Sequence, residues 1–282
     1  MSDAGETGLE GIAAWPGEQR AAGWVRVDGE RATAGPVEAP FPLASVTKVL
    51  TSLAVLVAVE EEVLALDEPA GPPGSTVRLL LCHASGLPFE GTEPIAAPGR
   101  RRIYGNAGFD ILGRLVSERA GVPFATYLDE AVCQPLELRS TALDGSPAHG
   151  ARSCVDDLLR LGAELLAPAR VVAPATLAAA VTPQLPELAG VLPGFGRHDP
   201  NPWGLGLELH GSKTPHWMPP QASPRAFGHF GQSGTFLWVD PDAGVACTAL
   251  CDEPFGRWAT TAWPALGASV LARSAVHGGS TL

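Results

Sequence analysis

The chain has 282 residues, of which 45% are hydrophobic and 17% charged, and its formal net charge is −11. A chain this apolar is expected to fold, and its length favours two lobes, because one domain usually takes about 100–200 residues. Acidic residues outnumber basic ones by 30 to 19 and no basic run occurs, so a nucleic-acid partner is not expected. No apolar stretch reaches the roughly 18 residues of a membrane-spanning helix, so no membrane partner is expected either.

The N-terminal residues and the cysteines indicate the cellular compartment. The first seven residues are polar and acidic and lack the charged and apolar regions of a secretory leader. The cysteines are odd in number and widely scattered, which fits reduced thiols better than a disulfide framework. They are Cys82, Cys133, Cys154, Cys247 and Cys251. We therefore expect a cytoplasmic protein.

The first quarter of the chain predicts two strands and a helix. The strands cover residues 21–27 and 32–37, with a turn at 28–30 between them. A helix is expected over 45–61, after Pro42, because proline and the residue before it disfavour helical geometry. Apolar residues occupy nearly every side of this helix, so we expect it to be buried all round.

The middle of the chain predicts helices and loops. Gly121 is a typical residue just past the end of a helix, and Pro123 suits the first turn of the next. The predicted helices are 76–82, 107–120, 123–132, 155–166 and 174–181.

After residue 203 the pattern changes to strands, followed by one closing helix. The predicted strands are 204–209, 227–229, 235–240 and 244–250, and the helix is 258–273. The chain thus has strands at both ends and helices between them. We expect a mixed α/β (α+β) fold, in which an antiparallel sheet flanked by terminal helices carries an inserted, mostly helical lobe.

The predicted lobes follow from this order of elements. Residues 1–44 and 203–282 would form the mixed α/β lobe, and residues 45–202 the mostly helical one. Clefts between lobes are favoured places for small-molecule sites, so the active site is expected there. The oligomeric state has no signature in the sequence.

A serine and a lysine stand three residues apart at the start of the predicted helix, as Ser45-Val46-Thr47-Lys48. Such positions share a helix face, with Cβ atoms about 5–6 Å apart, so the amine can hydrogen-bond the hydroxyl and, when neutral, accept its proton. The chain has only two lysines, and S-x-x-K is expected about 0.1 times by chance. The alternative, an N-capping serine beside a surface lysine, is disfavoured because a lysine is costly to bury without a function.

Two further motifs follow. Tyr104-Gly105-Asn106 puts a phenol and a carboxamide two residues apart just before a helix, where both can face one cleft. The alternative is a packed tyrosine beside an asparagine cap. The third motif, H-x-G at residues 229–231, is expected about 0.8 times by chance, so its occurrence alone indicates little. A functional role is supported instead by its position at the end of a strand near the C-terminus.

Other kinds of site find no matching pattern. G-x-S-x-G and H-E-x-x-H are absent, and the G-x-G at 204–206 leads into a predicted strand and not a helix. We expect no cofactor and no metal. His198, His210 and His216 lie in predicted loops with no visible partner.

The three motifs in this order resemble the serine β-lactamases and penicillin-binding proteins. Y-x-N and a histidine in the third motif are similar to the branch of class C β-lactamases, DD-peptidases and family VIII esterases. The resemblance spans about residues 20–270, and its flanking text is FPLASVTK (41–48), TVRLLLCHASGLP (76–88), YGNAGFDILGRLV (104–116), NPWGLGLEL (201–209) and FGHFGQSGTFLWVDPDAGV (227–245).

The resemblance implies a role for each proton-transferring residue. Ser45 would be the acylated nucleophile and Lys48 its general base. Tyr104 would relay the proton to the leaving group and activate water for deacylation. The backbone N–H groups of Ser45 and Gln232 would form the oxyanion hole.

Four residues would bind the substrate by the same resemblance. Asn106 would hold its amide or carbonyl group, and His229 would replace the usual lysine of the third motif. Phe230 and Gly231 would line the site beside them. In β-lactamases the position of Phe230 is typically Thr or Ser, whose hydroxyl helps to bind the substrate carboxylate, so penicillin and cephalosporin hydrolysis should be weak.

The resemblance therefore predicts a serine acyl hydrolase that acts on a small ester, amide or β-lactam through an acyl-Ser45 intermediate. Its partner is a small-molecule acyl substrate. Two alternatives stay open: a transacylase that uses the same acyl-enzyme, and a non-catalytic acyl-binding or sensor protein. The full set of Ser45, Lys48 and Tyr104 favours catalysis, because binding alone needs no proton-transfer chain.

Overall fold

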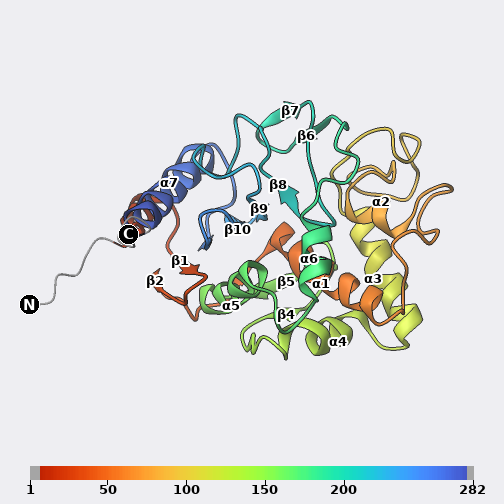
Figure 1. Cartoon of the computed structure of the whole chain (residues 1–282), viewed down its shortest axis with the longest axis horizontal. Helices are drawn as coiled ribbons and strands as arrows, with labels where there is room; N and C mark the ends of the chain where they lie inside the picture. The colour runs from red at the N-terminus through yellow and green to blue at the C-terminus, as the bar shows by residue number, and fades with distance from the viewer. Residues whose placement is uncertain (1–6, 278–282) are drawn as a thin grey trace, which may run out of the picture.

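A six-stranded antiparallel sheet is the largest layer of the computed structural model, which describes residues 7–277 (Figure 1). Its strand order is β2-β1-β11-β10-β9-β8. The strands are β1 (Arg20–Arg26), β2 (Arg31–Ala34), β8 (Glu208–Leu209), β9 (Phe227–Gly231), β10 (Thr235–Asp240) and β11 (Val245–Cys251). The two ends of the chain thus meet in one sheet, where β1 pairs with β11 along its whole length.

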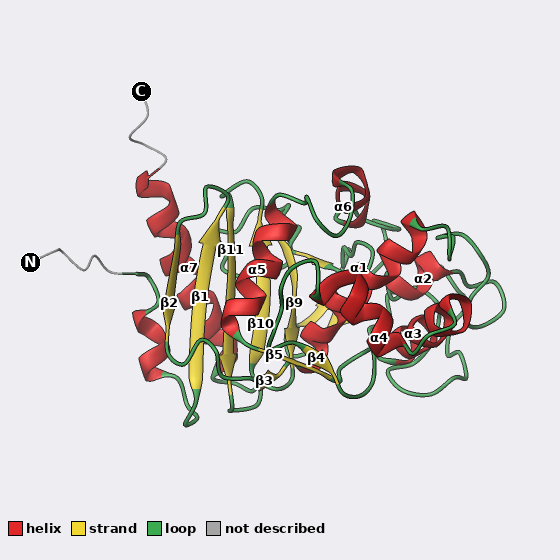
Figure 2. Cartoon of the chain, turned by 90° about the horizontal axis from the view of Figure 1, so that it is seen from below, coloured by secondary structure: helices red, strands yellow, loops and turns green. Residues whose placement is uncertain are grey.

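Helices cover both faces of this sheet (Figure 2). The helix α5 (Val155–Leu166) packs on β1, β10 and β11, and α7 (Ala259–His277) with the short 3-10 helix η1 (Glu10–Ala14) lies on the opposite face. Strands β9, β10 and β11 are buried at every residue because both of their faces are covered. The expected sheet flanked by terminal helices is confirmed.

Apart from α5, the helices of the middle of the chain gather beyond the β9 side of the sheet (Figure 2). They are α1 (Thr47–Glu60), α2 (Val77–Leu81), α3 (Ala107–Ala120), α4 (Phe124–Leu128) and α6 (Pro174–Ala180), with a 3-10 turn η2 (Ala44–Val46) before α1 and a π turn η3 (Asp129–Cys133) after α4. Helix α1 packs against α3 and α4, and every residue from Thr47 to Ala58 is buried. Its expected all-round burial is confirmed.

Five short strands escaped prediction. β3 (Phe41–Pro42), β5 (Ala151–Ser153) and β4 (Ala142–Leu143) form a small sheet, and β6 (Gly190–Leu192) and β7 (Gly196–His198) form a hairpin. Two or three residues are too few for an alternating pattern. Conversely, the strand expected over 204–209 is limited to β8, because Gly206 has a φ of +80° and turns the chain before it.

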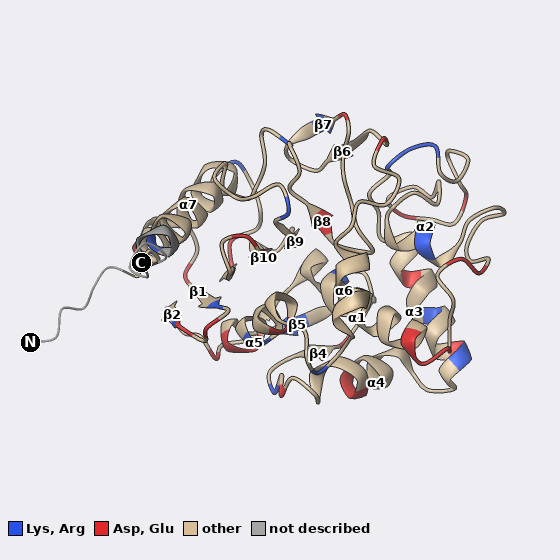
Figure 3. Ribbon diagram, in the orientation of Figure 1, with Lys and Arg blue, Asp and Glu red and all other residues tan. Residues whose placement is uncertain are grey.

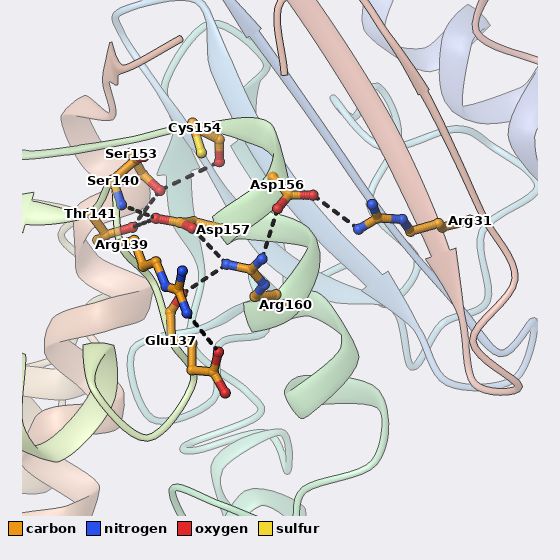
Figure 4. Close-up of polar contacts among 10 residues, drawn as sticks. All are labelled: Arg31, Glu137, Arg139, Ser140, Thr141, Ser153, Cys154, Asp156, Asp157 and Arg160. Atoms are coloured by element: carbon orange, nitrogen blue, oxygen red, sulfur yellow. Dashed lines mark hydrogen bonds and ion pairs between the residues drawn. The ribbon is translucent and has the colours of Figure 1, made fainter. Parts of the chain in front are cut away.

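A polar network fixes the first turn of α5 (Figure 4). The carboxylate of Asp157 accepts hydrogen bonds from the Ser140 backbone N–H at 2.7 Å and from the Thr141 hydroxyl at 2.9 Å. Asp156 pairs with Arg31 of β2 at 2.9 Å. These contacts connect α5 to the sheet and to the loop before β4, although α5 belongs by sequence to the predicted helical lobe.

The mixed α/β fold class is confirmed, whereas the division into lobes at residues 44 and 203 stays a prediction. Residues 1–6 and 278–282, which the predicted α/β lobe includes, lie outside the described residues. Among residues 7–277 no helix is both long and apolar enough to cross a membrane.

Candidate active site

Ser45 and Lys48 lie on consecutive turns at the head of α1. Ser45 is half-buried in the 3-10 turn η2, and Lys48 is fully buried in the first turn of the helix. The Lys48 Nζ atom lies 3.2 Å from the Ser45 Oγ atom, within hydrogen-bond distance. Ala44, just before the serine, has a φ of +44°, a left-handed conformation that costs a non-glycine residue energy and is often found at functional sites.

Lys48 has two further partners. Its Nζ donates to Asn106 Oδ1 at 2.7 Å and to the Ala148 carbonyl oxygen at 3.0 Å. Burial lowers the pKa of Lys48 to about 7, and the negative charges of Asp110 and Glu90 oppose that shift. The amine is therefore close to half neutral at neutral pH, as a general base requires.

Tyr104 is a second residue in contact with the serine. Its hydroxyl hydrogen-bonds the Ser45 side chain, and the Lys48 Nζ atom lies 5.0 Å from the centre of its ring. Loss of water around the phenol raises its pKa, which the bond to Ser45 partly offsets. The rings of His83 and Trp203 pack around it, with centroids at 4.8 and 5.8 Å. Tyr104 is thus held neutral and fixed beside the serine.

Asn106 lies at the N-cap of α3 and bridges two charged residues. Its Oδ1 accepts from Lys48, while its Nδ2 donates to Glu90 Oε1 at 2.6 Å. Only 5% of Asn106 is exposed. Both ends of its carboxamide are therefore engaged within the chain.

The third motif runs along β9. His229 is buried, and its Nδ1 lies 2.7 Å from the Phe230 carbonyl oxygen. A carbonyl can only accept, so Nδ1 carries the proton and Nε2 of the neutral ring is an acceptor. Burial lowers the pKa of His229 to about 3, and the charge of Lys48 adds to that effect, so the ring is neutral at ordinary pH. Within residues 7–277, Nε2 is buried without a hydrogen-bond partner.

Gly231 and Ser233 place β9 against the serine. A side chain at Gly231 would collide with the Leu43 carbonyl oxygen and touch Ala44, so the close approach of the strand requires glycine. The Ser233 hydroxyl donates to the Pro42 carbonyl oxygen at 2.6 Å. The turn after β9 is thereby attached to the segment that leads into the nucleophile position.

A cavity of about 110 Å³ opens beside the serine. Its walls are Ser45, Phe89, Tyr104, Leu192, Pro193, Trp203, Glu208, His229, Phe230 and Gln232. The structure thus brings Ser45, Tyr104, His229, Phe230 and Gln232 of the predicted set to one cavity. Lys48, Asn106 and Gly231 are not among its walls but lie directly behind them.

One wall is a buried carboxylate that sequence reasoning missed. Glu208 Oε1 accepts from Lys213 Nζ at 2.5 Å and lies 2.8 Å from His216 Nε2, and its Oε2 accepts from Trp217 at 2.7 Å. Although burial opposes ionisation, the charges of Lys213 and His216 lower the pKa of Glu208. The expectation that His216 lacks a partner is wrong. The signal available was Lys213, one of only two lysines, five residues after Glu208.

The chain is similar to known proteins in sequence and in fold. A family model described as Beta-lactamase matches residues 12–270. The crystal structure of a β-lactamase from Mycobacterium bovis has a TM-score of 0.93 to this chain and 49% identity, and it covers 95% of this chain and 99% of its own.

Two curated proteins show more distant similarity. The D-alanyl-D-alanine-carboxypeptidase/endopeptidase AmpH of Escherichia coli is 25% identical over 43% of this chain, and the match spans only 43% of that protein's length. The acyltransferase mokF of Monascus pilosus is 28% identical over 36% of this chain and 37% of its own. Because the family model matches most of the sequence, the chain belongs to the β-lactamase family.

Proposed function

We propose that the protein is a serine acyl hydrolase of the class C β-lactamase type. It acts, through an acyl-Ser45 intermediate, on small esters that carry no charge next to the scissile bond. The observation that carries the proposal is the set of three contacts made by Lys48 Nζ. A neutral amine has two N–H groups and one lone pair. The Asn106 and Ala148 oxygens take the two N–H groups, so the lone pair is left for the hydroxyl proton of Ser45.

In this proposal the proton moves through groups that already touch. Lys48 accepts the proton as Ser45 Oγ attacks the ester carbonyl. Tyr104, hydrogen-bonded to Ser45, gives its own proton to the leaving alcohol and becomes a phenolate. In deacylation the phenolate takes a proton from the water that attacks the acyl group. Lys48 returns its proton to Ser45 Oγ as the free acid leaves. The backbone N–H groups of Ser45 and Gln232, two walls of the same cavity, would stabilise the oxyanion.

The polarity of the cavity supports a neutral substrate group next to the ester. His229 offers an acceptor and not a cation, Glu208 adds a negative charge, and Phe230 offers no hydrogen bond from its side chain. A carboxylate in this position would find no cationic side chain among the walls of the cavity. Penicillins and cephalosporins carry a carboxylate near the scissile amide, so we expect them to be poor substrates.

A second candidate function is acyl transfer to an alcohol or amine. It is favoured by the similarity to an acyltransferase and requires the same acyl-Ser45 intermediate. Product analysis with and without added alcohol separates the two activities: hydrolysis gives only the free acid, whereas transfer gives a new ester.

The direct test of the nucleophile is covalent labelling by a fluorophosphonate, followed by intact mass. The wild type should gain one adduct and lose esterase activity in parallel, and Ser45→Ala should do neither. Ser85→Ala and the exposed Ser212→Ala serve as matched controls and should label like the wild type. Labelling that persists in Ser45→Ala would overturn the assignment, and labelling without turnover of any ester would favour an acyl-binding protein.

A further inference from the structure

A second hollow, of about 290 Å³, continues outward from the Ser45 cavity. The two share Phe89, Tyr104 and Pro193 as walls, so a ligand bound at the serine can extend from one into the other. The outer hollow lies between the loop that joins α2 to α3 and the β6–β7 hairpin, which Figure 1 shows side by side. We call it the outer groove.

The outer groove collects the exposed apolar side chains of the protein. Among residues 7–273, whose side chains the structure describes, four large hydrophobic side chains are exposed, and three of them line this groove: Phe89 at 51%, Ile95 at 63% and Val191 at 58%. The fourth, Val27, lies far from it in the turn between β1 and β2. Apolar surface gathered in a hollow beside an active site marks a place where apolar ligand is buried.

Cationic side chains also line the outer groove. Arg101 is exposed and makes no ion pair within the described part of the chain. Arg197 pairs with Asp199 at 2.8 Å. Arg102 is buried and donates to backbone carbonyl oxygens such as that of Asn201, so it holds the wall together. Figure 3 shows the basic residues of this loop in blue beside α2.

We propose that the outer groove binds an apolar chain of the ester substrate, with an anionic group at the far end of that chain beside Arg101. The inference rests on the proposed ester hydrolysis and names its substrate class: an ester that is neutral next to the scissile bond, apolar along its chain and anionic at its tip. A carboxylate on the substrate is thus disfavoured next to Ser45 and favoured at the end of the substrate chain that lies beside Arg101.

The first test is a chain-length series of esters with two to ten carbons, run both as 4-nitrophenyl alkanoates and as alkyl acetates. Each methylene buried should raise kcat/KM by about fourfold in at least one series until the groove is filled. Ile95→Ser and Val191→Ser should flatten that slope and leave hydrolysis of the two-carbon ester unchanged. Val27→Ser, an equally exposed apolar residue elsewhere, is the matched control and should keep the wild-type slope.

The second test addresses the anionic tip. The mono-4-nitrophenyl ester of suberate carries a carboxylate at the end of an eight-carbon chain, and 4-nitrophenyl octanoate lacks it. Arg101→Ala should lower the ratio of kcat/KM for suberate over octanoate by about twofold to fivefold, the size of an exposed ion pair. Arg139→Ala, at an exposed arginine outside the groove, should leave the ratio unchanged.

The outcomes separate this inference from the proposed function. If kcat/KM does not rise with chain length in either series while the acetate ester is still hydrolysed, the proposed role of the outer groove is wrong but the proposed hydrolase activity stands. If no ester is hydrolysed, calorimetric titration with octanoate still tests the groove: binding lost in Ile95→Ser supports it, and no binding to the wild type overturns it. Unchanged slopes together with a smaller sedimenting species in Ile95→Ser would identify the surface as an interface between copies of this chain, which also overturns the proposal.

Discussion

The Nζ atom of Lys48 lies 2.7 Å from the Oδ1 atom of Asn106, so the first turn of α1 is joined to the N-cap of α3 inside the protein. The contact engages one N–H of the amine and fixes the direction of its remaining bonds. It makes the second sequence motif part of the environment of the first.

Replacement of Lys48 tests the proton acceptor. Lys48→Ala should lower kcat/KM for 4-nitrophenyl acetate by about 10²–10⁴-fold, the usual contribution of a positioned acid or base. Lys48→Arg should be equally impaired, because a guanidinium does not lose its proton. Thermal unfolding checks that each variant is folded, and a folded Lys48→Ala with near wild-type activity would exclude the lysine as base.

The pH profile should follow the ionisation of Lys48. Its pKa is lowered to about 7, and only the neutral amine accepts a proton, so kcat/KM should rise with pH below about 7 and level off above it. The negative charge of Glu90 raises this pKa, so Glu90→Gln should move the rise to lower pH. Glu93→Gln, an exposed carboxylate on the same loop, should not, and a shift to higher pH in Glu90→Gln would contradict the assignment.

Phe230 should affect both stability and specificity. Its ring packs against those of Phe255 and Trp217, with centroids at 5.1 and 5.7 Å, so Phe230→Thr should cost about 3 kcal/mol or more in the free energy of unfolding. It should also shift the ratio of kcat/KM values from 4-nitrophenyl acetate toward nitrocefin by at least about tenfold, because the new hydroxyl can bind a carboxylate.

The control for Phe230 is its cross-strand partner Phe236, which belongs to the same apolar cluster but is not a wall of the cavity. Phe236→Thr should destabilise the protein similarly and leave the substrate ratio unchanged. An equal shift of the ratio in both variants would mean that Phe230 acts through stability and not through contact with the substrate.

The buried pair of Glu208 and Lys213 should be sensitive to the loss of one member. Glu208→Gln leaves the Lys213 ammonium buried without its counter-charge, which should cost about 3–5 kcal/mol in urea unfolding. Adding Lys213→Met removes the stranded charge, so the double variant should be more stable than Glu208→Gln alone. If the double variant loses as much free energy of unfolding as Glu208→Gln and Lys213→Met lose together, the two groups do not interact.

The long elements were predictable from sequence, because local signals bound them. Helix α3 matches its predicted bounds, since Gly121 adopts the left-handed conformation that ends it, with a φ of +74°. Helix α5 also matches, and so does β10. The small sheet of β3, β4 and β5 was not predictable, because its strands have only two or three residues. In addition, the pairing of β3 with β5 joins residues more than 100 positions apart.

The three site motifs were identified by residue type and order, and the structure brings their side chains together. Glu208 was not identified, because it lies in an apolar segment and its partners Lys213 and His216 lie in a loop, so the rarity of Lys213 was the one signal for it. The outer groove could not be predicted from the sequence either, because Ile95 lies in the loop between α2 and α3 whereas Val191 lies in the β6–β7 hairpin. Such sites depend on tertiary contacts alone.

The most direct measurement of the central claim is acid quenching during steady-state turnover of a 4-nitrophenyl ester, followed by digestion and mass spectrometry of the peptide that contains Ser45. The account predicts an acyl adduct on Ser45 that decays when substrate is exhausted, persists longer in Tyr104→Phe and is absent in Ser45→Ala. An acyl group found on another residue, or turnover at the wild-type rate in Ser45→Ala, would contradict it.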